Sequence, residues 1–165
     1  SLLESDRAPY DALASNPSRY AAELRFERVP DDDKSLPSIH WNPSYIDGCQ
    51  RTKHAPSVIA RYSCLLEGER DSVSKRNRLS RREPSVTLRA GTGIDKGSNT
   101  AARPIHYDQP RVTTVREGAR LMGYPDWMTF HHTKWHGCML VGNGVAAPVA
   151  KAIGRQLMSA LRQRR

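Results

Sequence analysis

Residues 113–126 read Thr-Thr-Val-Arg-Glu-Gly-Ala-Arg-Leu-Met-Gly-Tyr-Pro-Asp and carry the strongest local signal in the chain. Thr114 followed by Glu117 forms a capping box, in which each side chain caps a backbone N–H at the start of a helix. Apolar or small residues then recur at helical spacing and give the helix one buried face, namely Val115, Gly118, Ala119 and Met122. Gly123 ends the helix and Pro125 prevents its continuation. A short, well-capped helix is therefore predicted here.

Two arginines lie on another face of this predicted helix. Arg116 and Arg120 are four residues apart and hence one turn apart. Two guanidinium groups at this spacing could hold DNA phosphates, or they could brace neighbouring loops through internal hydrogen bonds. Bracing is favoured, because Arg120 lies next to the buried face.

Composition predicts one domain, or a domain with an appended lobe, in these 165 residues. Hydrophobic residues make up 38%, with 11 Gly and 11 Pro, which indicates a modest core and much irregular chain. The net charge of +9 is uneven. Residues 1–50 hold five basic and nine acidic residues, hence −4, so the remainder carries +13. Nucleic acid is the leading partner for such an excess, and a merely solvated basic face is the alternative.

The three cysteines, Cys49, Cys64 and Cys138, show no paired spacing. Together with the lack of a signal-peptide pattern and of an apolar run of 18 residues, they predict a cytoplasmic protein with no membrane association. Cys64 lies beside the apolar face of a helix predicted over 53–68, and we expect it to be a small buried hydrophobe.

The remaining pattern predicts an α+β fold, a small mixed domain with short twisted strands, long loops and about three to four helices. Further helices are expected within 12–26 and 145–161, and short strands at 85–89, 103–106 and 111–113. In the N-terminal third, Trp41 and Tyr45 are packing anchors or base-stacking platforms, with packing favoured.

The most basic stretch has five cations within eight residues: Lys75, Arg76, Arg78, Arg81 and Arg82. The predicted strand 85–89 follows, with Val86 and Leu88 inward, and leads into the glycine loop 90–93. Glycines at such a loop let backbone approach a ligand closely. Further along, His131, His132, His136 and Cys138 raise a zinc hypothesis, but their spacing matches no compact zinc pattern, so a packed loop is favoured and no metal is predicted.

Residues 116–126, Arg-Glu-x-Ala-Arg-Leu-x-Gly-Tyr-Pro-Asp, resemble motif IX of the DNA (cytosine-5) methyltransferases. Residues 142–145, Gly-Asn-Gly-Val, resemble motif X of that family, and Thr87-Leu88 before the glycine loop resembles its target-recognition region. The resemblance covers roughly residues 54–158. It implies a poorly defined segment 1–53, a target-recognition domain 54–130, and a segment 131–165 whose last helix packs on a separate catalytic Rossmann-like domain.

The resemblance also implies functional residues. The S-adenosylmethionine pocket, shared with the catalytic domain, would be lined here by Asn143, Gly144 and Val145. Double-stranded DNA would be contacted by polar or small residues of the basic stretch, the glycine loop and the motif IX helix: Arg78, Arg81, Arg82, Thr87, Arg89, Gly91, Thr92, Gly93, Lys96, Arg103, Arg116 and Arg120. Asn99 would extend this surface.

The family's nucleophile is a cysteine that follows a proline, and none of the three cysteines here does so. The Phe-x-Gly-x-Gly and Glu-Asn-Val segments of the family are also missing. We therefore expect no catalytic residue in this chain, which would methylate cytosine C5 only with a catalytic chain or domain, as in a split restriction-modification enzyme of bacteria or phage. A free-standing DNA-binding or regulatory module is the alternative.

Overall fold

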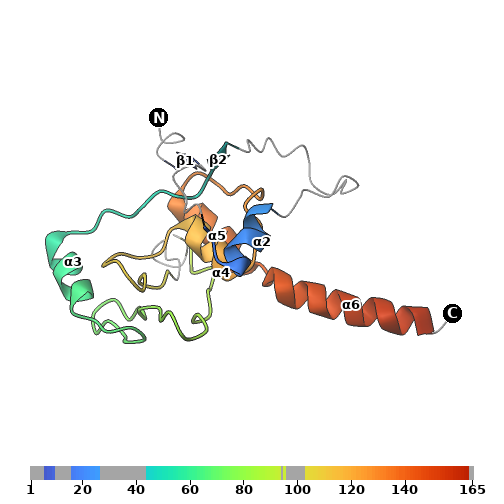
Figure 1. Cartoon of the computed structure of the whole chain (residues 1–165). Coiled ribbons are helices and arrows are strands. Elements are labelled where there is room, and N and C mark those ends of the chain that lie inside the picture. The colour runs from blue at the N-terminus through green and yellow to red at the C-terminus, as the bar shows by residue number, and fades with distance from the viewer. Residues whose placement is uncertain (1–5, 10–15, 27–43, 94, 96–102, 164–165) are drawn as a thin grey trace.

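The computed structural model describes residues 6–9, 16–26, 44–93, 95 and 103–163 (Figure 1). These ranges contain five helices and one two-stranded antiparallel sheet joined by long loops, which confirms the α+β class. The helices are α2 (Arg19–Phe26), α3 (Pro56–Ser63), α4 (Val115–Leu121), α5 (Lys134–Asn143) and α6 (Ala147–Gln163). Trp41, Lys96 and Asn99 lie outside the described residues.

The sheet joins β1 (Ala8–Pro9) to β2 (Tyr45–Ile46), with Ala8 opposite Ile46. Just before β1, the carboxylate of Asp6 accepts the backbone N–H of Gly48 at 3.0 Å and that of Gln50 at 3.2 Å. Residues around β2 are therefore held in one conformation, and they pass directly beside the start of α4, where the Gly48 carbonyl accepts the N–H of Arg116 at 2.9 Å.

Helix α4 is the centre of the packing and has the predicted cap. Thr114 accepts the N–H of Glu117 at 3.2 Å, and the Glu117 carboxylate accepts the N–H of Thr114 at 2.8 Å. The expected face is buried, with Val115 2% and Ala119 0% exposed. Gly123 follows with a φ of 73°, the left-handed geometry predicted for the helix end.

Helix α5 replaces the packed loop that was expected over residues 131–138. Val141 on this helix packs against Val115 and Ala119 of α4. Gly137 lets the two helices approach, because a Cβ there would lie 2.8 Å from a methyl of Val115. The packing thus compensates for the low helix propensity of a segment with two glycines.

A second core cluster lies beside α3 and contains Tyr62, Ile105 and Val112, with Val58 and Leu65 packed against it. Ile105 pairs with Val112 in an antiparallel bridge, so the strands expected at 103–106 and 111–113 are reduced to one paired position each. The expectation for Cys64 was wrong. It is exposed, because the helix ends at Ser63 and the chain turns there.

Residues 85–89 form no strand in the part of the chain that the structure describes. Leu88 does point inward and packs on the α4–α5 cluster, but Val86 is 39% exposed. Without a paired neighbouring strand, side-chain packing rather than a hydrogen-bonded ladder positions this segment.

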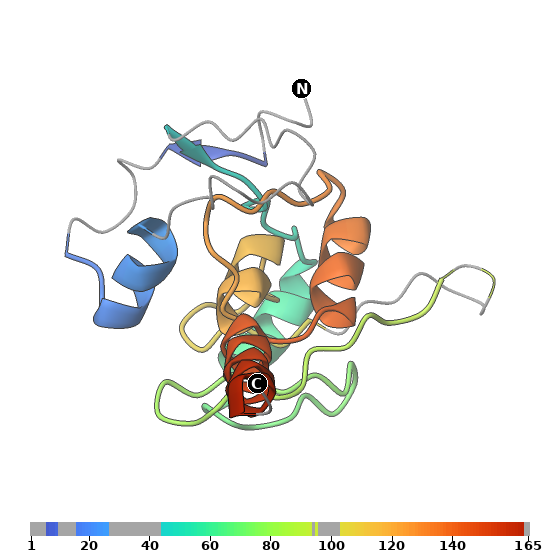
Figure 2. The same ribbon diagram turned by 90° about the vertical axis from the view of Figure 1, so that its right-hand side faces the viewer.

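Helix α6 extends away from the body of the molecule, with the C-terminus at its far end (Figures 1 and 2). None of its described residues is buried. The run Lys134–Gln163 is long and apolar enough to cross a membrane by length and composition alone, a test that helices of soluble proteins also pass. However, it is divided at Gly144 into α5, which packs on α4, and α6, which carries Lys151 and Arg155.

Candidate nucleic-acid interface

A tight hairpin spans residues 68–78, after α3, and contains the first three cations of the basic stretch. The backbone N–H of Gly68 donates to the carbonyl of Arg78 at 3.1 Å, and Arg70 pairs with Asn77 in an antiparallel bridge. Lys75 has a φ of 58° in the turn, the left-handed region that non-glycine residues rarely adopt. The hairpin therefore presents Lys75 and Arg76 in a defined geometry rather than on a free loop.

Asp71 holds this hairpin from inside. Its carboxylate is fully buried, and it accepts Arg61 Nε at 2.7 Å and the Ser74 N–H at 2.6 Å. Burial alone would raise the pKa of Asp71, but the hydrogen bonds from Ser74 and the ion pair with Arg61 lower it to about 2. Asp71 is thus a charged anchor at neutral pH.

Two of the arginines predicted to contact DNA have internal partners. Arg78 donates to the carbonyl oxygens of Tyr62 at 2.7 Å and Leu65 at 3.0 Å, at the end of α3. Arg81 pairs with Asp108 at 2.5 Å and lies 4.9 Å from the centre of the Tyr107 ring. Arg78 thus ties the basic stretch to the end of α3, and Arg81 ties it to the loop that contains Tyr107 and Asp108. Arg82 is exposed.

A groove of about 560 Å³ opens between the hairpin and the segment 86–89. It brings together three predicted residues, Thr87, Arg89 and Arg103. Sequence reasoning did not place the hairpin in this groove, which is also lined by Arg70, Lys75, Arg76 and Asn77. Five cations line the groove and no carboxylate does, so its field favours a polyanion.

The predicted glycine loop lies beyond the lining of this groove. Gly91 has a φ of 83°, which requires the freedom of glycine, and Thr92 is exposed next to it. The preceding backbone at Arg89 and Ala90 packs directly on α5. A Cβ at Gly142 would lie 2.5 Å from the Ala90 nitrogen and 2.6 Å from the Arg89 carbonyl oxygen.

The two arginines of the motif IX helix are turned into the protein. Arg116 is 3% exposed; it is ion-paired with Asp47 and donates to the Met128 carbonyl at 2.7 Å. Arg120 donates two hydrogen bonds to the carboxylate of the buried Asp126, from Nε at 3.0 Å and from Nη2 at 2.6 Å. This geometry agrees with the bracing role and leaves the Arg116 guanidinium no access to a DNA phosphate.

The motif X residues lie where α5 ends and the chain turns into α6. Asn143 and Val145 are exposed there, Val145 at 62%. Gly144 has a packing reason to be glycine, because a Cβ would collide with the Tyr124 hydroxyl. The junction offers one exposed amide and one exposed apolar side chain, which suits one wall of a ligand pocket, and no described pocket is enclosed by these residues alone.

The histidine-rich segment holds no metal group in the part of the chain that the structure describes. His131 stacks on His132 with ring centres 4.3 Å apart, and His136 lies 4.6 Å from His131. Cys138 instead faces the α4–α5 cluster, and burial raises the pKa of its thiol. Burial likewise raises the pKa of Cys49 to about 11. Neither thiol has the environment of an activated nucleophile.

Comparison with known proteins identifies the family. The model of the C-5 cytosine-specific DNA methylases matches residues 16–159. The chain belongs to this family. Among its methylase relatives, the type II methyltransferase M.XorII of Xanthomonas oryzae pv. oryzae is 41% identical over 153 residues, which are 93% of this chain and 36% of that protein. The chain thus spans about a third of the length of this relative.

Other methylases match in part. DNA (cytosine-5)-methyltransferase 2 of Arabidopsis thaliana is 46% identical over 57 residues, which are 34% of this chain and 4% of that protein. The solved structure of a DNA modification methyltransferase encoded within an Escherichia coli prophage is 40% identical, with a TM-score of 0.62 over 72% of this chain and 30% of that chain. The methylase fold of this segment is therefore shared at both the sequence and structural levels.

Proposed function

We propose that this chain is the target-recognition part of a DNA (cytosine-5) methyltransferase, with residues 54–130 holding DNA and residues 131–165 completing the cofactor pocket and docking on a catalytic part. The observation that carries the proposal is the acid-free basic groove on a methylase fold. Bound there, duplex DNA would lie beside Thr87 and Arg89, side chains suited to base edges.

The catalytic step is assigned to another chain or domain. A methylase nucleophile must be a thiolate. Cys49 and Cys138 have raised thiol pKa values, and Cys64 follows Ser63 rather than a proline. This chain accordingly contributes binding and orientation, and it holds the DNA while the cytosine is flipped out of the stack.

The cofactor implied by the family is S-adenosylmethionine, which supplies the methyl group when bound. Asn143 and Val145 would line it from the α5–α6 junction, and Tyr124 supports Gly144 from behind. The Tyr124 hydroxyl also donates to the Val145 carbonyl at 3.3 Å, which fixes the junction. The other walls of the pocket would come from the catalytic part.

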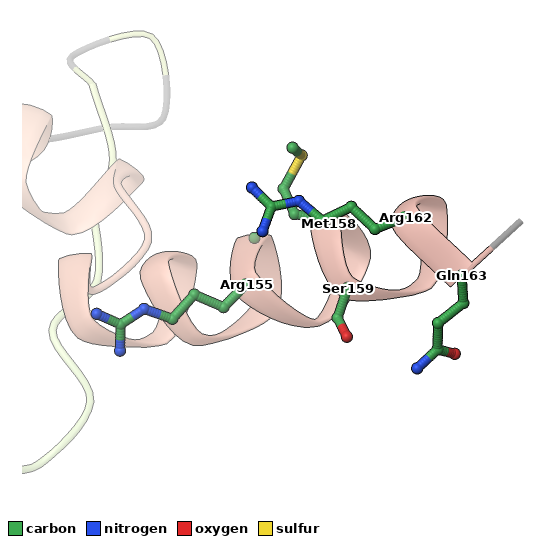
Figure 3. A pocket seen from close by; sticks show the side chains of 6 residues that line it. Arg155, Met158, Ser159, Arg162 and Gln163 are labelled. Carbon is green, nitrogen blue, oxygen red and sulfur yellow. The ribbon is translucent and has the colours of Figure 1, made fainter. Parts of the chain in front are cut away.

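Helix α6 is the proposed docking element. Its large apolar side chains are each at least half exposed: Val149, Ile153, Leu157, Met158 and Leu161. The side chains labelled in Figure 3, including Arg155 and Arg162, all belong to this single helix. An apolar stripe of this kind is stable in water when a partner covers it. A self-sufficient DNA-binding module would cover it internally or by self-association, and the described residues do not cover it internally.

The test is transfer of a radiolabelled methyl group to duplex DNA, with this chain alone and with the catalytic chain or domain that carries the Pro-Cys loop. Activity is expected only with both. A matched pair of variants tests docking: Leu157→Glu on the stripe should abolish the complex, and Gln156→Glu beside it should not. Robust methylation by this chain alone would refute the proposal.

A further inference from the structure

The basic groove contains two cations that differ from the rest. Arg70, Lys75 and Arg89 are exposed, whereas Arg76 and Arg103 are partly buried. Exposed cations are solvated and carry little information about a ligand. A partly buried cation that has no carboxylate partner is costly, so its presence in the groove requires an explanation.

Arg103 is such a cation. Its Nη1 donates to Thr52 Oγ1 at 2.9 Å, and its buried Nε has no hydrogen-bond partner among the described residues. No described carboxylate forms an ion pair with it. Burial lowers the pKa of Arg103; the neighbouring Cys138 raises it, and the charge of Arg76 lowers it. The folded chain therefore places two partly buried like charges along the same groove.

The surroundings show the same excess of positive charge. Burial lowers the pKa of His54, and the charges of Arg103, Arg76 and Lys134 add to that effect. Among the described residues, the Arg76 guanidinium makes only a long hydrogen bond of 3.5 Å, to the Tyr62 hydroxyl. No described carboxylate forms an ion pair with Arg76 or Arg103, so an external anion is the simplest compensation for their charge.

We propose that Arg76 and Arg103 jointly hold a single backbone phosphate of duplex DNA in the basic groove. The assignment rests on the proposed function, and it adds a residue, Arg76, and a positioning role to it. The Asp71 anchor fixes the hairpin that carries Arg76, so the phosphate would set the register of the DNA against Thr87 and Arg89. Phosphate contacts of this kind position the duplex on any sequence, whereas base contacts specify it.

The test measures binding of this chain to fluorescent duplexes of several unrelated sequences over a range of salt concentrations. Arg76→Gln and Arg103→Gln should each weaken binding equally on every sequence. Each should reduce the slope of log K against log salt by about 0.9, the value for one phosphate. Because both residues hold the same phosphate, the double variant should lose about the same slope as either single variant. Arg19→Gln, on the exposed face of α2, is the matched control and should change neither quantity.

Thermal unfolding without DNA separates binding from bracing. Arg76→Gln removes a like charge, so the melting temperature should stay the same or rise while DNA binding falls. If Arg103→Gln disturbs the fold, Arg103→Lys can be used instead, because it keeps the charge and removes the two-pronged guanidinium. Arg103→Lys should weaken DNA binding but change the slope of log K against log salt little.

Several results would overturn the phosphate site. These are additive slope losses in the double variant, losses that depend on sequence, a lower melting temperature for Arg76→Gln, or inorganic phosphate stabilising the chain as much as the duplex does. Normal binding by the variants would refute this inference and leave the proposed function intact. If the wild-type chain bound no duplex, alone or with the catalytic part, the proposed function itself would fail.

Discussion

Gly142→Ala tests whether α5 positions the backbone of Arg89 and Ala90, next to the basic groove, by direct contact. The new Cβ would lie within 2.6 Å of the backbone of Arg89 and Ala90. Backbone atoms cannot rotate away as the end of a long side chain can, so the segment or the helix must move. Overpacking of this kind costs about 1–3 kcal/mol, and the better helix propensity of alanine returns up to about 1 kcal/mol. We expect a net loss of about 1–2 kcal/mol from these opposing effects.

The matched control is Gly154→Ala on α6, where an added Cβ meets no atom within 4 Å. This substitution should be neutral or stabilise the chain by up to about 1 kcal/mol through helix propensity alone. Urea unfolding gives the free energies, and duplex binding reports the displacement of Arg89. Two substitutions of the same chemistry should therefore act in opposite directions. If Gly142→Ala had the same effects as Gly154→Ala on unfolding and on duplex binding, the contact of α5 with Arg89 and Ala90 would be refuted.

Two other substitutions test the anchors of the fold. Asp71→Asn removes the ion pair with Arg61 and should cost about 2–3 kcal/mol, the range for hydrogen bonds to a charged group. The Asp71 pKa of about 2 lies below its ordinary value, so this contribution is present above about pH 4 and is lost as the pH falls toward 2. Urea unfolding at several pH values should show the wild type and Asp71→Asn converging in acid, and a constant difference would contradict the anchor. Arg116→Met leaves Asp47 unpaired and should cost about 3–5 kcal/mol, whereas Arg82→Met, at an exposed site, should change the unfolding free energy little.

Sequence reasoning succeeded where the signal is local. The capping box at Thr114 and Glu117 needs only a spacing of three residues, and the structure confirms it. The pairing of Arg70 with Asn77 could not be predicted in the same way. It depends on a turn in which Lys75, not a glycine, adopts the left-handed region, so the usual sequence marker of such a turn is missing.

Helix α5 was missed for a related reason. Its glycines lower helix propensity, and only the contacts of Gly137 with Val115 and of Gly142 with Arg89 explain their presence. Gly144 was assigned to the cofactor from resemblance, and the structure adds a steric cause in Tyr124. A glycine that allows close packing cannot be distinguished in the sequence from a glycine that makes room for a ligand, because in both cases the only signal is the missing side chain.

In the proposed function, helix α4 (residues 115–121) would connect the DNA groove to the cofactor wall. Arg116 ties it to Asp47, and Arg120 ties it to Asp126. Its apolar face packs on α5, which contacts the groove segment through Gly142 and ends at the motif X junction. A phosphate seated by Arg76 and Arg103 would therefore bear on the same rigid pair of helices that presents Asn143. In the proposed enzyme, this one packed unit would set both the position of the DNA and the shape of the cofactor wall.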